Sequence, residues 1–295
     1  MKWINVFCLI CMFLCAGSFH SSVVAAEKDD FEYAENLFQD GNFFEAAIAF
    51  ERIFFLSGDS QVRIKANLRR AEALKQQGKF REARMDLQRS VHLRNFPDEH
   101  FMVLYQMAFC DYMLGNYTRV ISGLRQLEHF YPERSNAEKV WLLYALAHIM
   151  NSEYEQARAF TDSLIAIQLV DENIAEELKR ESQRIFSTEN LPVVKSENRA
   201  ANLSTFLPGV GHMYAGYPGK GILNASSQVI ALGLAGIMAY HQLYISGFVI
   251  GLGMFQSFYF GGIRQATFLA AQRNLKETAN WKEQARSFVI EVYEL

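Results

Sequence analysis

The chain has 295 residues, half of them hydrophobic, and a formal net charge of −3. This length permits one or two domains with a sizeable core, and the slightly acidic balance lacks the basic stripe that nucleic-acid binding requires. Phenylalanine occurs 24 times and proline only 5 times, which favours long helices over a loop-rich fold. We therefore expect an all-α protein without a nucleic-acid partner.

Residues 1–26 have the features of a secretory signal peptide. Lys2 supplies a positive start, residues 6–14 form an apolar core, and residues 24–26 place Val-Ala-Ala before the expected cleavage point, as such signals require. A retained N-terminal anchor is the alternative, and either interpretation exports the residues that follow. Three of the four cysteines lie inside this segment, so the exported chain keeps only Cys110 and has no internal disulfide.

A repeat of 37 residues follows the signal. Each unit has a turn residue, an aromatic two places later, a small residue three places after that, and an alanine seven places before the turn. The turns are Gly41, Gly78, Gly115 and Ser152; the aromatics are Phe43, Phe80, Tyr117 and Tyr154; the later small residues are Ala46, Ala83, Val120 and Ala157; the earlier alanines are Ala34, Ala71, Ala108 and Ala145. Small residues let two helices approach closely, and glycine permits the positive φ that ends a helix. The repeat therefore predicts four pairs of antiparallel helices.

This pattern resembles the tetratricopeptide repeat family over residues 27–170. The resemblance rests on Gly-Asn-Phe-Phe-Glu-Ala-Ala at 41–47 and Gly-Lys-Phe-Arg-Glu-Ala-Arg at 78–84. It implies a helical solenoid over residues 27–186, with four units and a capping helix at 171–186. The period of 37 exceeds the family's usual repeat of about 34 residues, and we expect longer loops or helices to absorb the difference.

The same resemblance implies a concave surface, formed by the first helix of each unit, that binds other protein chains. In the first two units the corresponding positions are mixed and polar, whereas in the last two they are apolar and aromatic. We call these apolar positions the stripe: Met102, Tyr105, Phe109, Tyr112, Met113, Leu142, Leu146, Ile149 and Met150. Methionine and aromatic surfaces adapt to apolar or amphipathic ligands, so we expect a groove for a protein or peptide. The alternative is that these residues are simply buried, against the helix at 171–186 or against a neighbour.

Residues 187–202 are polar and irregular and are expected to form a linker before a membrane hairpin. No Asp, Glu, Lys or Arg occurs between Gly221 and Ile263. The two apolar runs, 222–240 and 243–262, are each long enough to cross a bilayer, and their short connection makes them antiparallel. A buried hairpin in a soluble domain is the alternative. Residues 264–295 are expected to form an amphipathic helical tail.

A glycine-rich motif precedes the hairpin within the segment 203–263. Its marked residues are Pro208, Gly209, Gly211, His212, Tyr214 and Gly216. It resembles a Pro-Gly-x-Gly-(His/Gln)-x-Tyr-x-Gly signature found before small two-span bacterial membrane domains, many of them of unknown function. His212 is its one candidate for a chemical role, with an interfacial anchor as the alternative.

We find no metal-binding, phosphate-binding or nucleophile motif, and expect neither an enzyme nor a cofactor. The sequence favours a scaffold in the cell envelope, anchored in the cytoplasmic membrane, whose repeats recruit a partner on the periplasmic or extracytoplasmic side. A structural subunit of an assembly or transport complex and a membrane enzyme using His212 are the alternatives. Lys195, Arg199, Lys220, Arg264 and Arg273 flank the hairpin, and the tendency of such residues to remain cytoplasmic opposes that orientation.

Overall fold

The computed structural model describes residues 29–134, 137–168 and 171–295. Within these residues every regular element is a helix and there is no strand, which confirms the expected all-α class. The chain divides into two compact units. Residues up to Lys179, together with Val289–Leu295, form the array unit, and Arg180–Phe288 form the hairpin unit. The expected signal peptide lies outside the described residues.

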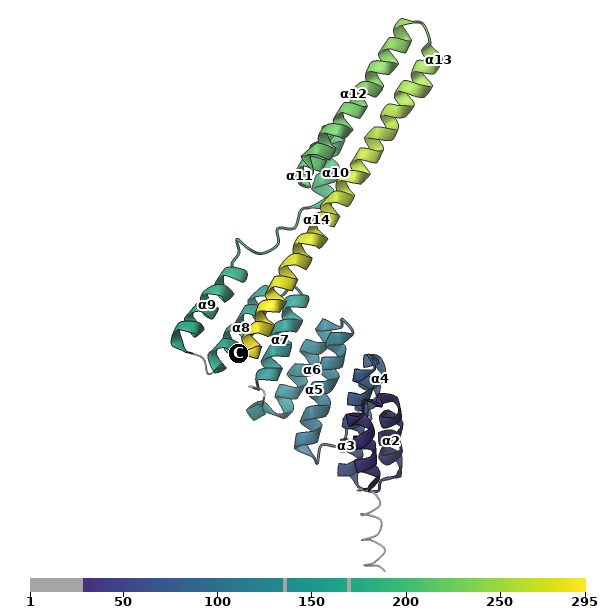
Figure 1. The fold of residues 1–295 in the computed structure, drawn as a ribbon. Helices are drawn as coiled ribbons and strands as arrows, with labels where there is room; N and C mark the ends of the chain where they lie inside the picture. The colour runs from purple at the N-terminus through teal and green to yellow at the C-terminus, as the bar shows by residue number, and fades with distance from the viewer. Residues whose placement is uncertain (1–28, 135–136, 169–170) are drawn as a thin grey trace, which may run out of the picture. The chain divides into compact units, whose positions relative to one another are not determined.

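The array unit is a series of helices in which each contacts the next (Figure 1). Residues 29–39 are helical and precede the first complete element. The elements are α2 (Phe43–Leu56), α3 (Ser60–Gln76), α4 (Phe80–Gln88), α5 (Pro97–Met113), α6 (Tyr117–Phe130), the short η1 (Pro132–Arg134), α7 (Glu138–Met150) and α8 (Tyr154–Ile167). The starts of α2, α4, α6 and α8 are 37 residues apart, as are the ends of α3, α5 and α7. The period of the sequence is therefore also a period of the structure.

The repeated residues have the conformations that their types favour. Gly41, Gly78 and Gly115 have φ between 73° and 79°, and Ser152, which replaces glycine in the fourth unit, has φ 62°. Each ends one helix and leads into the next, because a left-handed residue stops helical hydrogen bonding. The small residues on either side of these turns are all buried, where their size lets neighbouring helices approach.

The hairpin unit begins in the last part of α9 (Glu172–Ile185), and two short helices, α10 (Glu197–Phe206) and α11 (Val210–Tyr214), follow. The hairpin itself consists of α12 (Pro218–Tyr240), α13 (Tyr244–Ser246), the π-helical η2 (Gly247–Leu252) and α14 (Gly253–Glu294). The last residues of α14 belong to the array unit. The linker expected at 187–202 is irregular only up to Ser196, since Ser196 caps α10 by accepting a hydrogen bond from the backbone of Arg199. The helical tail expected at 264–295 forms the C-terminal part of α14.

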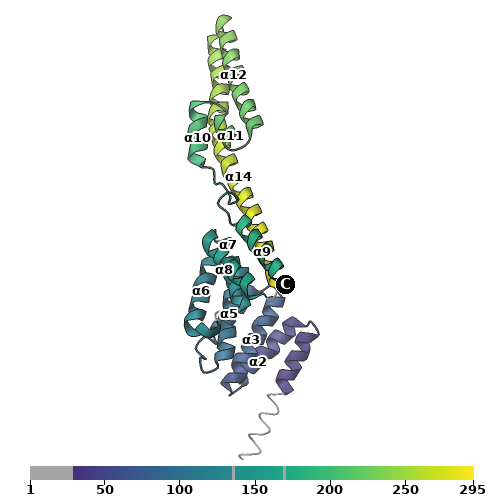
Figure 2. The same ribbon diagram turned by 90° about the vertical axis from the view of Figure 1, so that its left-hand side faces the viewer.

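The two long arms of the hairpin lie side by side (Figures 1 and 2). They approach closely because small residues meet: a side chain at Gly251 would lie within 2.4 Å of the Cβ of Ala235, and one at Gly262 within 2.5 Å of the Asn224 amide. Such contacts are typical of membrane helices. Among the described residues, α12 and the continuous segment Tyr244–Glu294 are long and apolar enough to cross a membrane. The segment 203–218 contains only short helices and offers no third candidate of that length.

Candidate functional site

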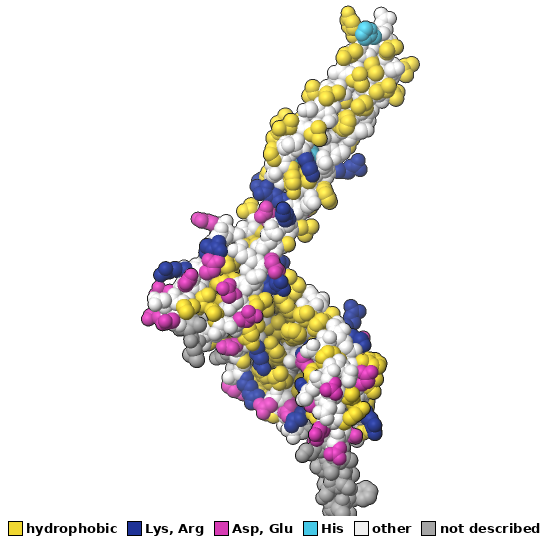
Figure 3. All heavy atoms as spheres, in the orientation of Figure 1, with side chains coloured by type: hydrophobic (Ala, Val, Ile, Leu, Met, Phe, Trp, Pro, Cys, Tyr) yellow, Lys and Arg dark blue, Asp and Glu magenta, His cyan; other side chains and the backbone are white. Residues whose placement is uncertain are grey.

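The third-unit part of the stripe lies on α5 and is partly accessible. Met102, Tyr105, Phe109 and Tyr112 are half-buried against the core of the array, while Met113 is 47% exposed. The Phe109 ring packs edge-on against Phe80, with 6.5 Å between ring centroids. Figure 3 shows hydrophobic side chains gathered over this part of the array. This half of the stripe therefore presents apolar surface.

The fourth-unit part of the stripe, on α7, is mostly core. Leu146 and Ile149 are 8% and 0% exposed, and only Leu142 and Met150 keep part of their surface. The helical spacing that placed these residues on one face did not specify how much of that face would be covered. The surface available to a partner is thus centred on α5.

Lys139, at the start of α7, adds a positive charge beside the stripe that sequence reasoning missed. Its ammonium nitrogen lies 5.1 Å from the ring centroid of Tyr105 and 3.3 Å from the sulfur of Met102. Burial lowers the pKa of Lys139. Among the described residues no carboxylate lies within ion-pair distance of it, so its charge is balanced only by aromatic faces.

The last seven residues of the chain, Val289–Leu295, belong to the same compact unit as the stripe. Val289 and Val292 are fully buried. Burial, and to a smaller extent the phenol of Tyr293, raises the pKa of Tyr105 to about 12. The end of the chain therefore lies close to the stripe, a proximity that no local sequence pattern indicated.

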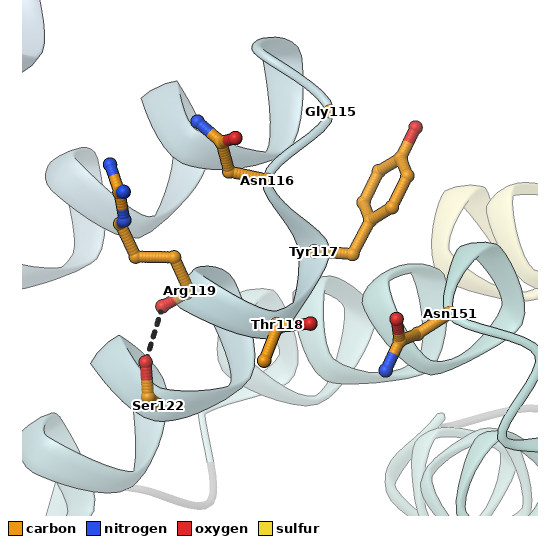
Figure 4. A pocket seen from close by; sticks show the side chains of 7 residues that line it. All are labelled: Gly115, Asn116, Tyr117, Thr118, Arg119, Ser122 and Asn151. Atoms are coloured by element: carbon orange, nitrogen blue, oxygen red, sulfur yellow. Dashed lines mark hydrogen bonds between the residues drawn. The ribbon is translucent and has the colours of Figure 1, made fainter.

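A separate open hollow of about 520 Å³ lies at the turn between α5 and α6. Figure 4 shows its lining. The residues are Gly115, Asn116, Tyr117, Thr118, Arg119, Ser122 and Asn151. The Ser122 hydroxyl donates to the backbone oxygen of Arg119, and the Arg119 guanidinium is 3.5 Å from Asp111. The lining offers hydrogen-bonding groups but pairs no nucleophile with a base.

The glycines of the motif are sites of close backbone approach inside the hairpin unit. Gly209 has φ +86° and faces the backbone of Gly221, where a side chain would meet the carbonyl oxygen at 2.2 Å. At Gly211, a side chain would meet the carbonyl oxygen of Ala200 at 2.1 Å and the hydroxyl of Ser204 at 2.2 Å. The glycines that follow Pro208 therefore let α10, α11 and α12 pack closely together.

The motif's aromatic and imidazole groups complete this packing. His212 is fully buried on α11, with its Nε2 3.1 Å from the side-chain oxygen of Gln265 on α14. The Tyr214 hydroxyl accepts a hydrogen bond from the backbone of Ser196, and the Arg273 guanidinium reaches the backbone oxygen of Ala215 beside Gly216. In this arrangement His212 joins two helices and presents no accessible atom to a soluble substrate.

Asp98, Glu99 and His100 are adjacent in the sequence but have separate structural partners. Asp98 pairs with Arg134, Glu99 accepts from Gln61, and His100 is buried against Tyr131 and Val91. Burial also raises the pKa of the Cys110 thiol to about 11, which keeps it protonated and unreactive. Among the described residues no group of His, Cys, Asp or Glu is arranged to hold a metal ion.

Comparison with known proteins gave no match to a protein-family model and no significantly similar curated protein. The candidate surfaces therefore rest on the sequence and on the geometry described above.

Proposed function

We propose that this protein is a membrane-anchored scaffold or adaptor. Its repeat array, a solenoid of the tetratricopeptide type, recruits a protein or peptide, and its hairpin at 222–262 holds the array at the cytoplasmic membrane. The observation that carries the proposal is the accessible apolar surface on α5, because exposed methionine and aromatic side chains are typical of peptide-binding grooves. Binding rather than catalysis is proposed, since the surface on α5 consists of apolar and aromatic side chains.

Lys139 narrows the kind of partner that fits this surface. An unpaired ammonium group beside Met102 and Tyr105 favours a segment that combines apolar side chains with a carboxylate. An amphipathic helix or an extended peptide with an acidic residue meets both requirements.

The hairpin supports the anchoring part of the proposal. Large apolar side chains cover its outer surface: Ile222, Leu223, Val229, Ile230, Ile237, Phe248 and Val249 are each at least 58% exposed. Water disfavours such a surface, whereas lipid chains do not. We place the array on the periplasmic side because of the signal peptide expected from the sequence. A second candidate, a structural subunit that acts through hairpin contacts in a larger complex, is favoured by the same exposed surface.

Photo-crosslinking in cells tests the recruitment site. A photoreactive amino acid at Tyr105, Phe109 or Met113 is expected to capture one discrete protein, whereas the same group at outward-facing Arg119 is expected to capture none. Crosslinks would be identified by mass spectrometry. Capture of nothing, or only of the chain's own residues 289–295, would contradict recruitment through this surface. Capture through positions on the hairpin instead would favour the second candidate.

A further inference from the structure

The base of the hairpin carries positive charges that have no protein partners. Between residues 190 and 276 the chain contains six Lys or Arg residues and a single acidic residue, Glu197. Arg273 lies 3.8 Å from Glu277. Lys276 is next to Glu277 in the sequence, and the other four cations, which we call the basic belt, are Lys195, Arg199, Lys220 and Arg264. Among the described residues, none of these four has a carboxylate within ion-pair distance.

Several cations of the array unit, by contrast, have carboxylate partners. Arg84 forms two hydrogen bonds of 2.8 Å with Asp111, Arg70 pairs with Glu51, and Arg134 pairs with Asp98. Proteins in water commonly distribute acidic and basic side chains together in this way. The scarcity of acidic residues around the basic belt, where Glu197 is the single one between residues 190 and 276, is thus a local property of the hairpin unit's sequence, and it leaves a net positive surface.

The basic belt lies where the apolar surface of the hairpin ends. Lys220 and Arg264 directly flank the charge-free run from Gly221 to Ile263. The close contact between Gly262 and Asn224 fixes the antiparallel register of α12 and α14 and brings these two flanks to the same end of the hairpin. Figure 3 shows Lys and Arg side chains below the apolar part of the hairpin on that face.

The α10 helix is fixed along α14, which holds the other two cations near this boundary. The side-chain amide of Asn274 bonds both the backbone nitrogen and the backbone oxygen of Lys195, at 2.7 and 2.8 Å. At the other end of α10, the Tyr259 hydroxyl donates to the backbone oxygen of Thr205. Phe206, which follows, is 84% exposed. Thus the segment 195–206 runs from Lys195 and Arg199 at its start to the exposed Phe206 at its end, beside the apolar part of the hairpin.

Two cations of the basic belt lie over tyrosine rings. The Lys195 ammonium lies 5.1 Å from the ring centroid of Tyr214, and the Lys220 ammonium lies 5.2 Å from that of Tyr217. Tyrosine is enriched where a membrane meets water, and Lys and Arg there direct their charges toward the headgroups. Positive charge, a position near the end of the apolar surface and neighbouring tyrosine rings are together typical of a site for anionic headgroups.

We propose that the basic belt binds the headgroups of anionic phospholipids, which surround the hairpin in preference to zwitterionic lipids. This inference rests on the membrane anchoring proposed above and adds the lipid class and the residues that select it. Phosphate oxygens supply the negative charge that the local protein sequence lacks, and four cations without carboxylate partners near the base of the hairpin offer several contacts at once.

Electron spin resonance with spin-labelled lipids tests the preference directly. The full-length chain would be placed in phosphatidylcholine nanodiscs with a trace of spin-labelled phosphatidylglycerol or, separately, spin-labelled phosphatidylcholine. The fraction of immobilised label measures the lipid at the protein surface. We expect the anionic label to be favoured by about threefold or more, and the preference to fall when salt is raised.

Two variants of equal charge separate the basic belt from general electrostatics. Replacing Lys195, Arg199, Lys220 and Arg264 by glutamine is expected to bring the preference close to equality. The control replaces four exposed cations of the array, Arg52, Arg81, Arg125 and Lys179, by glutamine. This control is expected to leave the lipid preference unchanged. Equal immobilisation of both labels by the unmodified chain, or an equal loss in both variants, would overturn the basic belt while leaving the anchoring intact. Immobilisation of neither label would overturn the anchoring and this inference with it.

Discussion

At the scale of single residues, His100 shows how the array uses a buried imidazole. The ring is 1% exposed, its Nδ1 lies 2.7 Å from the Tyr131 hydroxyl, and its Nε2 lies 2.8 Å from the Val91 carbonyl. The neutral ring satisfies both contacts by donating to Val91 and accepting from Tyr131. Burial lowers the pKa of His100, and the charge of Arg94 lowers it further, against the opposing effect of the Val91 hydrogen bond.

This lowered pKa makes the array less stable in acid. Below the ordinary pKa of about 6.5 the unfolded chain takes up a proton that the folded state resists, so stability is lost as the pH falls. We expect the urea midpoint of the detergent-solubilised chain, followed by circular dichroism, to drop between about pH 7.5 and 5.5. His100→Gln is expected to lower the midpoint at neutral pH and to reduce this drop. The exposed His129→Gln should behave like the unmodified chain, and an unchanged drop in His100→Gln would contradict the assignment.

At the scale of elements, the glycine motif determines how the short helices pack against the hairpin. Gly211 and Gly219 are eight residues apart and differ sharply in their surroundings. A side chain at Gly211 would collide with the backbone of α10, whereas one at Gly219 would meet no atom within 4 Å. Close packing therefore requires glycine at position 211 of the motif, whereas Gly219, which follows the motif, has open space around it.

Alanine substitutions at these two glycines test that distinction. We expect Gly211→Ala to destabilise the hairpin unit by roughly 1–3 kcal/mol, because the backbone of α10 must shift to accommodate the methyl group. Gly219→Ala is expected to change stability by less than about 0.5 kcal/mol. Limited proteolysis in detergent, with cleavage sites mapped to residues 187–217, would measure the effect. Equal resistance of both variants would show that the close contact is not required.

At the scale of the whole molecule, the chain combines a repeat unit rich in ion pairs with a hairpin unit whose outer surface is apolar. The two units place comparable apolar residues in different surroundings. Ile230 lies near the middle of α12 and is 67% exposed, while Ile48 on α2 is 54% exposed in the array. If the hairpin spans a membrane, only the first of these side chains faces lipid.

Replacing each isoleucine by aspartate distinguishes lipid from water. At the centre of a membrane helix an aspartate costs about 2.5–3.5 kcal/mol of insertion free energy, so Ile230→Asp should markedly reduce the fraction of chain that resists alkaline extraction from membranes. Ile48→Asp should leave that fraction unchanged, because water solvates the new charge. Full retention of the Ile230→Asp chain would contradict a membrane-spanning hairpin.

The sequence by itself determined the local features of this protein. The 37-residue period predicted the turns at Gly41, Gly78, Gly115 and Ser152, and the charge-free run after Lys220 predicted the hairpin. Both depend on neighbouring residues: the turns on a glycine, or a serine in the fourth unit, at a fixed place in each repeat, and the length of an apolar helix on an unbroken run.

Only the tertiary structure decided which of these residues are covered. Leu146 and Tyr105 belong to the same predicted stripe, yet one is core and the other keeps part of its surface, because burial depends on helices distant in sequence. Likewise, the role of Gly211 comes from Ala200 and Ser204, and the position of Lys195 from Asn274, 79 residues away. A helical period identifies the residues that share a face, but packing against distant segments determines what that face contacts.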